Sequence, residues 1–456
     1  MTVRSVSPQR PSDVVVEVAA ADRETVRTAA ETARRAQAEW LASPPVARSQ
    51  ALSAAADAVV GAAEELTALM VREVGKPLTE SAGEVARSAA ILRYYAQQVL
   101  DPDGETYPSP GEASLLMARR RPRGVVGLIT PWNFPLAIPL WKAAPALAYG
   151  NGVLLKPAPE STAMAQRLGE LIGSALPDGL LAVLPGEAET GEAVVDAADA
   201  VSFTGSVAAG QSVRLAAARR VIAVQCEMGG QNPSVVLPDA DVEGAASTVA
   251  AAAMGYAGQK CTATSRAIVV GDPAPFTAAL VAAVEALSVD DPDGKDVTVG
   301  PVITEDARAA VLQATAQVRE DGGRVLAGGE QLDRDGWFVA PTLVDSVPAG
   351  HVTAQEEVFG PFCVVLPAED VDAAVRLANG VRYGLTAAVF TRDLGAALSV
   401  SRRLAAGQIK VNAPTSGVDF YAPFGGEKDS SYGPREQGKA ARDFYTSVQT
   451  ITVLGG

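Results

Sequence analysis

Cys261 is the residue of this 456-residue chain that is best placed to act as a nucleophile. It stands in the polar segment GQKCTA, after a helix-like run of small residues, and Lys260 beside it favours the thiolate form. The other two cysteines, Cys226 and Cys363, lie in apolar runs typical of buried filler. A cysteine taken alone is more often such a filler, so the case for Cys261 depends on the groups that accompany it.

A carboxylate and an amide could complete a site of this kind. Glu227 ends the apolar run VIAVQC, where partial burial would raise its pKa and suit a general base for water. The alternative for Glu227 is a cap for the next element. Asn133 lies in the proline-bounded segment PWNFP, and its amide could donate to an oxyanion. A plain turn residue is the alternative for Asn133.

The chain contains one histidine, His351, between Gly350 and Val352. A single histidine argues against a catalytic triad with a histidine base and against a metal site with two histidines, and we expect no metal. Acid–base work would fall to carboxylates, lysine or cysteine. We expect His351 to be a loop residue without catalytic duty.

Composition excludes several partners. Lysine and arginine total 38 against 53 acidic residues, a net charge of −15, so a nucleic-acid backbone would be repelled. The basic cluster 119–123 is expected to be a solvated or interface arm, with attraction of an anion as the alternative.

No apolar run is long enough for a membrane span, and the N-terminus lacks the apolar core of a secretory signal. Three cysteines form no disulfide framework, so we expect a cytoplasmic protein.

The elements that must position these residues follow from apolar periodicity. Residues 21 to about 100 are predicted to be helical, with Asp22 as a cap and an end near Gly75. From Gly124 short apolar strands alternate with helices, one of them capped by Ser161, as in a parallel sheet with crossover helices. The segments PWN, KPA, FTGS and CEMGG each follow a strand, so they should line one rim, where ligands bind.

Three features of that rim suit a dinucleotide. The segment FTGS at 203–206 opens a helix whose free N–H groups could bind a pyrophosphate, although the fingerprint GxGxxG is missing and a plain cap is the alternative. Lys156 ends the strand VLLK and could contact phosphate or ribose, unless it is simply solvated. Glu357 and Phe359 in QEEVFGPF form a carboxylate–aromatic pair, for which packing is the alternative.

The motifs together resemble the aldehyde dehydrogenase superfamily. PWNFP, FTGS, EMGGQNP, GQKCTA, EEVFGPF and PFGGEKDSS occur in the family's order from about residue 12 to 450. The resemblance implies an α/β fold with three parts: a Rossmann-like parallel-sheet cofactor domain (1–105 and 123–227), an α/β catalytic domain (228–438) and a small β oligomerisation arm (106–122 and 439–456). It also implies a homodimer or homotetramer.

The resemblance implies a role for each matching position. Cys261 would be the nucleophile, Glu227 the general base, and Asn133 the side-chain half of an oxyanion hole completed by the Cys261 backbone N–H, while Lys142 would belong to the active-site network. The implied cofactor contacts are Thr130, Pro131, Trp132, Lys156, Ala158, Gly191, Phe203, Thr204, Gly205, Ser206, Met228, Gly229, Glu357 and Phe359. The implied substrate pocket comprises Tyr95, Phe134, Trp141, Lys260, Thr262, Phe420 and the loop 416–421.

The implied reaction is oxidation of an aldehyde to an acid with NAD(P)+. Thiolate attack gives a thiohemiacetal, oxidation gives a thioester, and water activated by Glu227 releases the acid, so no histidine is needed. A CoA-acylating dehydrogenase would discharge the same thioester to CoA, and Glu227 argues against that alternative. A non-catalytic binding protein on the same scaffold is the other alternative, against which the intact Cys261, Glu227 and Asn133 argue.

Some positions depart from the family pattern. The N-terminal strand segment looks shortened. Pro159 stands where many NAD-specific members have a glutamate, with Glu160 one step later, so we expect NADP to be accepted and even preferred. The motifs look most like those of 2,5-dioxopentanoate (α-ketoglutarate semialdehyde) dehydrogenases. The loop 416–421 has no cation for an anionic substrate, so another aliphatic aldehyde or semialdehyde is the main competitor.

Overall fold

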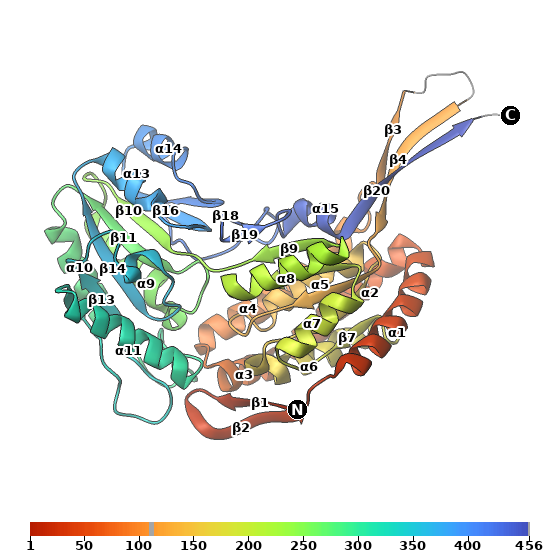
Figure 1. Ribbon diagram of the computed structural model, residues 1–456, viewed down its shortest axis with the longest axis horizontal. Coiled ribbons are helices and arrows are strands. Elements are labelled where there is room, and N and C mark those ends of the chain that lie inside the picture. Colours follow the sequence, from red (N-terminus) through yellow and green to blue (C-terminus); the bar gives the residue numbers. More distant parts are fainter. Residues whose placement is uncertain (109–113, 455–456) are drawn as a thin grey trace.

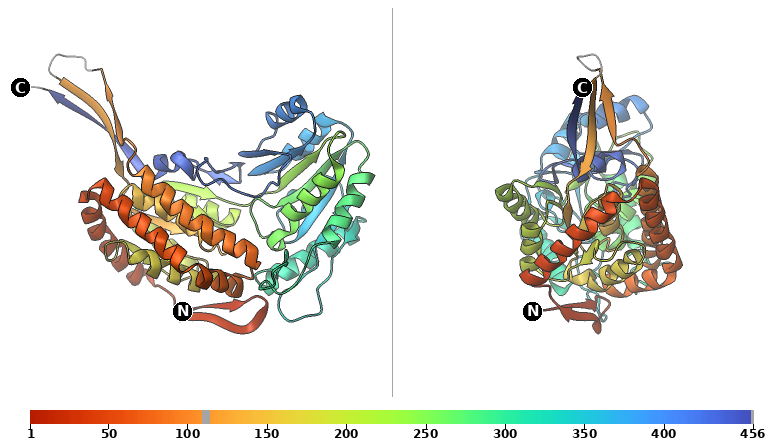
Figure 2. Two further views of the ribbon diagram at one scale, coloured as in Figure 1. Left: turned by 180° about the vertical axis from the view of Figure 1, so that it is seen from behind. Right: turned by 90° about the vertical axis from the view of Figure 1, so that its right-hand side faces the viewer.

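The computed structural model describes residues 1–108 and 114–454. Two α/β units lie side by side, and a β arm projects away from the first of them (Figure 1). The view from behind shows the same two units, with the chain's N-terminal hairpin at the end opposite the arm (Figure 2). The α/β class predicted from the alternation of strands and helices is therefore confirmed.

The first unit is built on a six-stranded sheet in the order β19–β9–β8–β5–β6–β7. Five of these strands are mutually parallel, and the central ones are buried on both faces, which explains their short, continuous apolar sequences. β19 is antiparallel and brings a late segment of the chain against β9. The strands are β5 (Val125–Ile129), β6 (Gly152–Lys156), β7 (Leu181–Val183), β8 (Ala200–Thr204), β9 (Ala223–Glu227) and β19 (Ser431–Tyr432).

Helices connect and cover this sheet, since parallel neighbours need crossover connections. α1 starts after Asp22, whose carboxylate accepts the Thr25 N–H at 2.8 Å, as predicted. The helical segment ending at Gly75 divides at Ala62 into α2 and α3, and Gly75 closes α3 in the left-handed conformation. The helices are α1 (Arg23–Ala42), α2 (Pro45–Gly61), α3 (Ala63–Val74), α4 (Leu78–Gln98), α5 (Ala137–Ala148), α6 (Thr162–Gly173), α7 (Ala188–Ala197) and α8 (Val207–Arg220).

The prediction that Ser161 caps α6 is wrong. The Ser161 hydroxyl donates back to the Ala158 carbonyl, and the first N–H groups of α6 bind a distant carboxylate instead. Glu73, on α3, accepts from the N–H groups of Ala163 and Met164, both at 2.8 Å. A helix start can thus be satisfied by a residue 90 positions away, which no local sequence signal reports.

The N-terminal 20 residues form a hairpin of β1 (Thr2–Ser7) and β2 (Arg10–Ala19). From the sequence we expected a shortened N-terminal strand segment, and the pairing of two strands into a hairpin was not predicted. Ser5 turns inward and donates to Glu73 at 2.7 Å, so the hairpin is tied to α3 by a buried polar contact.

The second unit is built on a seven-stranded sheet in the order β12–β13–β14–β11–β10–β16–β17, parallel except for the pair β12–β13. Its strands are β10 (Asn232–Val236), β11 (Thr264–Val270), β12 (Arg324–Ala327), β13 (Thr342–Asp345), β14 (Phe362–Ala368), β16 (Thr386–Phe390) and β17 (Gln408–Val411). Its helices are α9 (Val242–Met254), α10 (Ala274–Glu285), α11 (Glu305–Glu320), α12 (Val352–Gln355), α13 (Val371–Asn379) and α14 (Leu394–Ser401). A short ribbon of β15 (Tyr383–Gly384) and β18 (Glu427–Lys428) adjoins it.

The arm is a three-stranded antiparallel sheet in the order β20–β4–β3. Its strands are β3 (Gly104–Tyr107), β4 (Ser114–Pro122) and β20 (Thr446–Leu454), and the short helix α15 (Ala441–Tyr445) precedes β20. Residues 109–113 and 455–456 of the expected arm lie outside the described residues. In the described part of the chain, no helix has the length and apolar character that a bilayer crossing requires.

Candidate active site

At the carboxyl edge of the first sheet, the predicted rim residues lie on neighbouring strands at the same or the next register position. Lys156 pairs in register with Ile129, which pairs on its other side with Phe203. One row further, Thr204 pairs with Glu227. Thr130 and Pro131 continue directly from β5, and Ala158 follows β6. Four strands therefore end together at the segments that sequence analysis singled out.

Polar groups at this edge lack partners that a ligand could supply. The residue Lys156 is 7% exposed, and its ammonium has no hydrogen bond or ion pair to any described residue. Burial lowers its pKa to about 8, against smaller raising effects of Glu160 and Glu187. The hydroxyls of Thr130 and Thr204 are also buried without a partner among residues 1–108 and 114–454. These unsatisfied groups suit the ribose and phosphates of a dinucleotide.

Small residues leave the backbone near the rim accessible to a ligand. Ser206 caps α8, its hydroxyl accepting the Ala209 N–H at 3.3 Å. A Cβ on Gly205 would lie 2.6 Å from the Phe203 ring. Gly191 faces the Lys156 side chain, at 3.8 Å from a Cβ to Cδ. The start of α8 thus has the free N–H groups and close backbone approach that a pyrophosphate requires.

Glu357 reaches this edge from the second unit. One of its carboxylate oxygens accepts the Gly230 N–H at 3.0 Å, and a Cβ on Gly229 would lie only 2.1 Å from the other. Burial raises the pKa of Glu357 to about 7. Phe359, whose φ is +52°, lies edge-on to Trp132 with ring centroids 5.8 Å apart. The expected nicotinamide-side contacts from both units are therefore neighbours, and Met228, which precedes Gly229 in the chain, is buried.

Cys261 follows a tight turn that ends α9. Tyr256, Ala257 and Gly258 all have positive φ, and a Cβ on Gly258 would lie 2.1 Å from the Gly360 carbonyl oxygen. Because Gly258 has no side chain, its backbone can pass this close to the backbone of Gly360. The Cys261 carbonyl accepts the Asn232 amide at 2.8 Å, which ties the nucleophile's loop to β10. The cysteine itself is half-buried.

The expectation that Lys260 makes Cys261 electropositive is wrong. The Lys260 ammonium pairs with Glu80 of α4 at 2.8 Å and is thereby neutralised. Burial, followed by the charges of Glu357, Glu227 and Glu436, raises the pKa of the Cys261 thiol. The sequence showed the adjacent lysine but gave no sign of the acidic side chains that surround the thiol in space.

Asn133 lies beside this loop, in the segment between β5 and α5. Its side-chain N–H donates to the Gln259 carbonyl at 2.9 Å, two residues before Cys261. Its carbonyl oxygen is buried without a partner in the described part of the chain. The amide of Asn133 is therefore within the immediate neighbourhood of the cysteine, where a second N–H can serve a ligand.

Glu227 belongs to a buried carboxylate pair that sequence analysis missed. Ser431 of β19, directly opposite Glu227, donates to it at 2.5 Å. Burial, reinforced by the charge of Glu436, raises the pKa of Glu227 well above its usual value. Glu436 accepts from the Lys142 ammonium, which also donates to Ser202 at 2.7 Å. The motif SSYGPREQG contains Ser431 and Glu436, but its pattern does not disclose their contacts.

The residues expected to form the substrate pocket differ in burial and in their hydrogen-bond and ion-pair partners. Phe134 and Phe420 pack partly buried against the core cluster that contains Tyr95 and Trp141. Trp141 lies 6.0 Å from Phe424, and its indole N–H has no partner among the described residues. Tyr95 donates to the Gly438 carbonyl at 3.1 Å. Thr262 is buried, and Lys260 is held away by Glu80.

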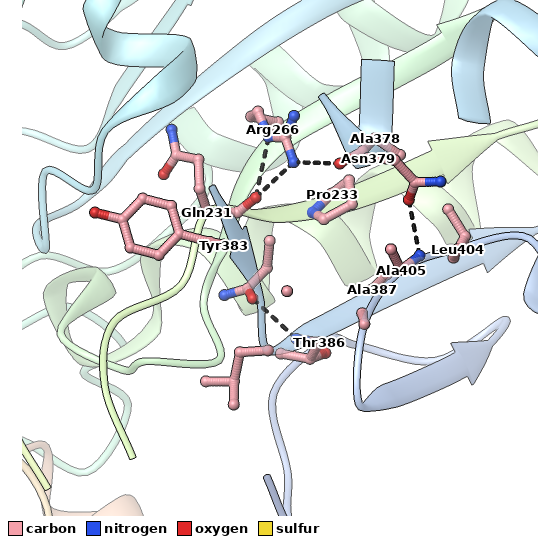
Figure 3. Close-up of a pocket in the computed structure, with 14 residues that line it drawn as sticks. Gln231, Pro233, Arg266, Ala378, Asn379, Tyr383, Thr386, Ala387, Leu404 and Ala405 are labelled. Carbon is pink, nitrogen blue, oxygen red and sulfur yellow. Dashed lines mark hydrogen bonds between the residues drawn. The ribbon is translucent and has the colours of Figure 1, made fainter. Parts of the chain in front are cut away.

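A small pocket of the second unit is lined by residues of β10, β11, α13 and β16 (Figure 3). Arg266 is fully buried there, and its guanidinium donates to the carbonyls of Gln231, Leu377 and Ala378. These hydrogen bonds show that Arg266, five positions after Cys261, holds backbone segments together. Within the described residues, no cluster of histidine, cysteine or carboxylate side chains could hold a metal ion.

Comparisons with known proteins agree with this geometry. The model of the aldehyde dehydrogenase family matches residues 1–451. An α-ketoglutaric semialdehyde dehydrogenase of Bacillus subtilis is 39% identical over 460 residues, covering 99% of this chain and 94% of that protein. A 2,5-dioxopentanoate dehydrogenase of Saccharolobus solfataricus is 36% identical over 454 residues, covering 98% and 95%. A betaine aldehyde dehydrogenase of Staphylococcus aureus in complex with NAD+ has a TM-score of 0.96 at 31% identity, covering 99% and 91%. The chain therefore belongs to the aldehyde dehydrogenase family, and it is an NAD(P)-dependent enzyme that oxidises aldehydes to carboxylic acids.

Proposed function

We propose that Cys261 forms the covalent bond to the aldehyde carbon. After the thiol has lost its proton, attack by the thiolate creates an oxyanion, which accepts hydrogen bonds from the N–H groups of the Asn133 side chain and the Cys261 backbone. The observation that carries this assignment is the 2.9 Å bond from Asn133 to Gln259, since it places an amide donor against the cysteine's loop.

The residues at the carboxyl edge of the first sheet would hold the cofactor. Lys156, Thr204 and the start of α8 would take the ribose and phosphates, while Glu357 and Phe359 would hold the nicotinamide side. Bound NAD(P)+ supplies the hydride acceptor. Trp132 and Met228 would exclude water from this side of the cleft, and the remaining predicted contacts would line it.

Glu227 is the group proposed to release the product. Its raised pKa gives it a strong affinity for a proton, so its ionised form is an effective base toward water attacking the Cys261 thioester. Lys142 would balance the charge of the neighbouring Glu436. A base buried beside the thioester favours hydrolysis, which argues against transfer of the acyl group to CoA.

For the substrate we propose 2,5-dioxopentanoate. Relatives that carry this activity in their names match the chain at 36–39% identity along nearly its whole length. The competing substrates are other aliphatic aldehydes and semialdehydes, because the pocket loop 416–421 has no cationic side chain.

An aldehyde panel tests these assignments. We expect absorbance of reduced nicotinamide with 2,5-dioxopentanoate, an acid product that needs no CoA, and a specificity constant at least about tenfold above those of propanal and betaine aldehyde. Cys261→Ala should abolish turnover while dinucleotide affinity persists. Undiminished turnover in that variant would contradict the mechanism, and a faster uncharged aldehyde would contradict the substrate alone.

Three further properties belong to the proposal. NADP is accepted and preferred, because Pro159 removes the carboxylate that would repel a 2′-phosphate, and Lys156 offers a nearby cation. The three cysteines are unpaired, which fits a reducing cytoplasm. The arm pairs subunits into a homodimer or homotetramer, since a projecting β sheet with exposed apolar side chains is a natural contact surface.

A further inference from the structure

Glu84, on α4, contacts the segment that carries the oxyanion amide. One of its carboxylate oxygens accepts the backbone N–H groups of Leu136 at 3.0 Å and Ala137 at 2.9 Å. These groups open α5, three and four residues after Asn133. Glu84 is 4% exposed, so both hydrogen bonds are shielded from water.

The start of α5 has no capping side chain of its own. Leu136 occupies the cap position, and the preceding residues Phe134 and Pro135 offer no acceptor. Helix starts normally recruit serine, threonine, aspartate or asparagine for this purpose. The Glu84 carboxylate therefore replaces a local cap, and its charge also matches the positive end of the helix dipole.

A buried lysine completes the contact and extends it to the nucleophile's side. Lys76 pairs with Glu84 and is fully buried. Its ammonium lies 3.7 Å from the centre of the Phe134 ring and 4.6 Å from that of Tyr256. Phe134 neighbours Asn133, while Tyr256 belongs to the turn before Cys261. One helical turn earlier on α4, Glu80 holds Lys260.

We propose that Glu84 is a positioning residue for the oxyanion-binding amide of Asn133. The Lys76–Glu84 pair contacts the segments on both sides of the oxyanion position, so it sets where the Asn133 amide lies relative to Cys261. This inference rests on the proposed role of Asn133. Misplacement of such a donor by about 1 Å can cost on the order of a hundredfold in rate.

Two neutral double variants separate the hydrogen bonds from the charges. Lys76→Met with Glu84→Gln retains an oxygen that can accept the two N–H groups. Lys76→Met with Glu84→Leu has a similar size and no acceptor. Neither leaves a single charge buried without its partner. Arg93→Gln is a control on the same helix, because Arg93 makes only an exposed pair with Asp57.

We expect kcat for the best aldehyde of the panel to be about 10- to 100-fold lower in the leucine variant than in the glutamine variant. NAD+ affinity and the rate of Cys261 alkylation by iodoacetamide should agree within about twofold, because alkylation forms no oxyanion. Arg93→Gln should match the wild type. Equal kcat values for the two double variants would overturn the proposal.

The same comparison in an Asn133→Ala background tests the route of the effect. If Glu84 acts through Asn133, the difference in kcat should shrink to within about twofold. A persisting difference would show an action through α5 as a whole and would overturn the inference. Should the leucine variant not fold, Glu84→Asp with Lys76 retained, compared with the wild type, replaces the two double variants in both backgrounds, because it withdraws the acceptor by one methylene and leaves the ammonium of Lys76 a carboxylate partner. Absence of aldehyde oxidation by the wild type would contradict the proposed function instead.

Discussion

At the scale of single residues, the site combines groups whose environments oppose their charged forms. Burial opposes ionisation of the Cys261 thiol and of the carboxyls of Glu227 and Glu357, and the charges of these two carboxylates also oppose ionisation of the thiol. Each therefore has a pKa above its ordinary range. Such arrangements cost stability and occur where a reaction needs proton affinity or a nucleophile that is protected until substrate arrives.

Alkylation of free Cys261 should be slow at neutral pH. Because the pKa of the thiol is raised, the thiolate fraction grows with pH across the accessible range, and the rate with iodoacetamide should rise about tenfold per pH unit from 6 to 9. Mass spectrometry of the modified peptide measures this rate, and Cys261→Ala is the control. A plateau reached below pH 8 would contradict the raised pKa.

Cofactor preference should depend on the charge of Lys156. Its pKa is lowered to about 8, so the ammonium is present at pH 7 and largely lost at pH 9. We expect the ratio of kcat/KM for NADP to that for NAD to fall by about tenfold over this interval, as a cation opposite the 2′-phosphate disappears. In Lys156→Gln the ratio should be low and independent of pH. A ratio that rises with pH in the wild type would contradict the assignment.

At the scale of elements, two buried glutamates perform the same task. Glu73 of α3 satisfies the start of α6, and Glu84 of α4 satisfies the start of α5. Both helices lack local caps and both follow strands of the first sheet. Long-range caps fix the helices on the sheet as well as closing their ends, because one side chain bonds two elements.

Glu73 should make stability fall as pH rises. Its folded pKa is raised to about 7 from an ordinary value of 4.5, so the folded chain binds more protons than the unfolded chain between these values. The contribution is fully present below about pH 4.5 and is lost as pH passes 7, at most about 3 kcal/mol. Urea midpoints for the wild type and Glu73→Gln from pH 5 to 8 measure it.

Glu73→Gln retains an oxygen that can accept hydrogen bonds but cannot ionise. The stability of this variant should therefore change less with pH between 5 and 8 than that of the wild type. Glu73→Ala should be less stable than Glu73→Gln at every pH, by about 2 kcal/mol, because the hydroxyl of Ser5 and two N–H groups lose their acceptor. A pH dependence that is unchanged in Glu73→Gln would assign it to another group.

At the scale of the whole molecule, the arm exposes large apolar side chains. Leu115 and Val453 lie directly opposite each other on β4 and β20, 42% and 48% exposed, and Leu454 is 76% exposed. The arm projects beyond both α/β units (Figure 1). Exposed apolar side chains on a projecting sheet are typical of a contact surface, which supports the proposed pairing of subunits through the arm.

Charges on the arm should therefore dissociate the proposed oligomer. We expect Leu115→Lys with Val453→Lys to shift the sedimentation coefficient from that of a dimer or tetramer toward that of a monomer, because lysines would be buried unpaired in the contact. Val221→Lys, at a position 92% exposed on the first unit, is the control and should sediment as the wild type. A wild type that sediments as a monomer would contradict the proposed role of the arm.

The sequence by itself determined the α/β class, the strands of the first sheet and the rim on which the motifs gather. This was possible because apolar runs mark buried parallel strands, and because the carboxyl ends of such strands share one edge. It also indicated which side chains were available for acid–base catalysis, since a chain with a single histidine depends on carboxylates, lysine or cysteine.

Only the tertiary structure decided how those groups are charged and held. Lys142 meets Glu436 across 294 positions, and Glu73 reaches α6 across 90. Proximity of this kind depends on packing. Lys260 is next to Cys261 in the chain but forms an ion pair with Glu80, whereas the charges that act on the Cys261 thiol belong to acidic residues distant in the sequence. The pKa of a group and the cap of a helix depend on neighbours in space, and local sequence does not specify these neighbours.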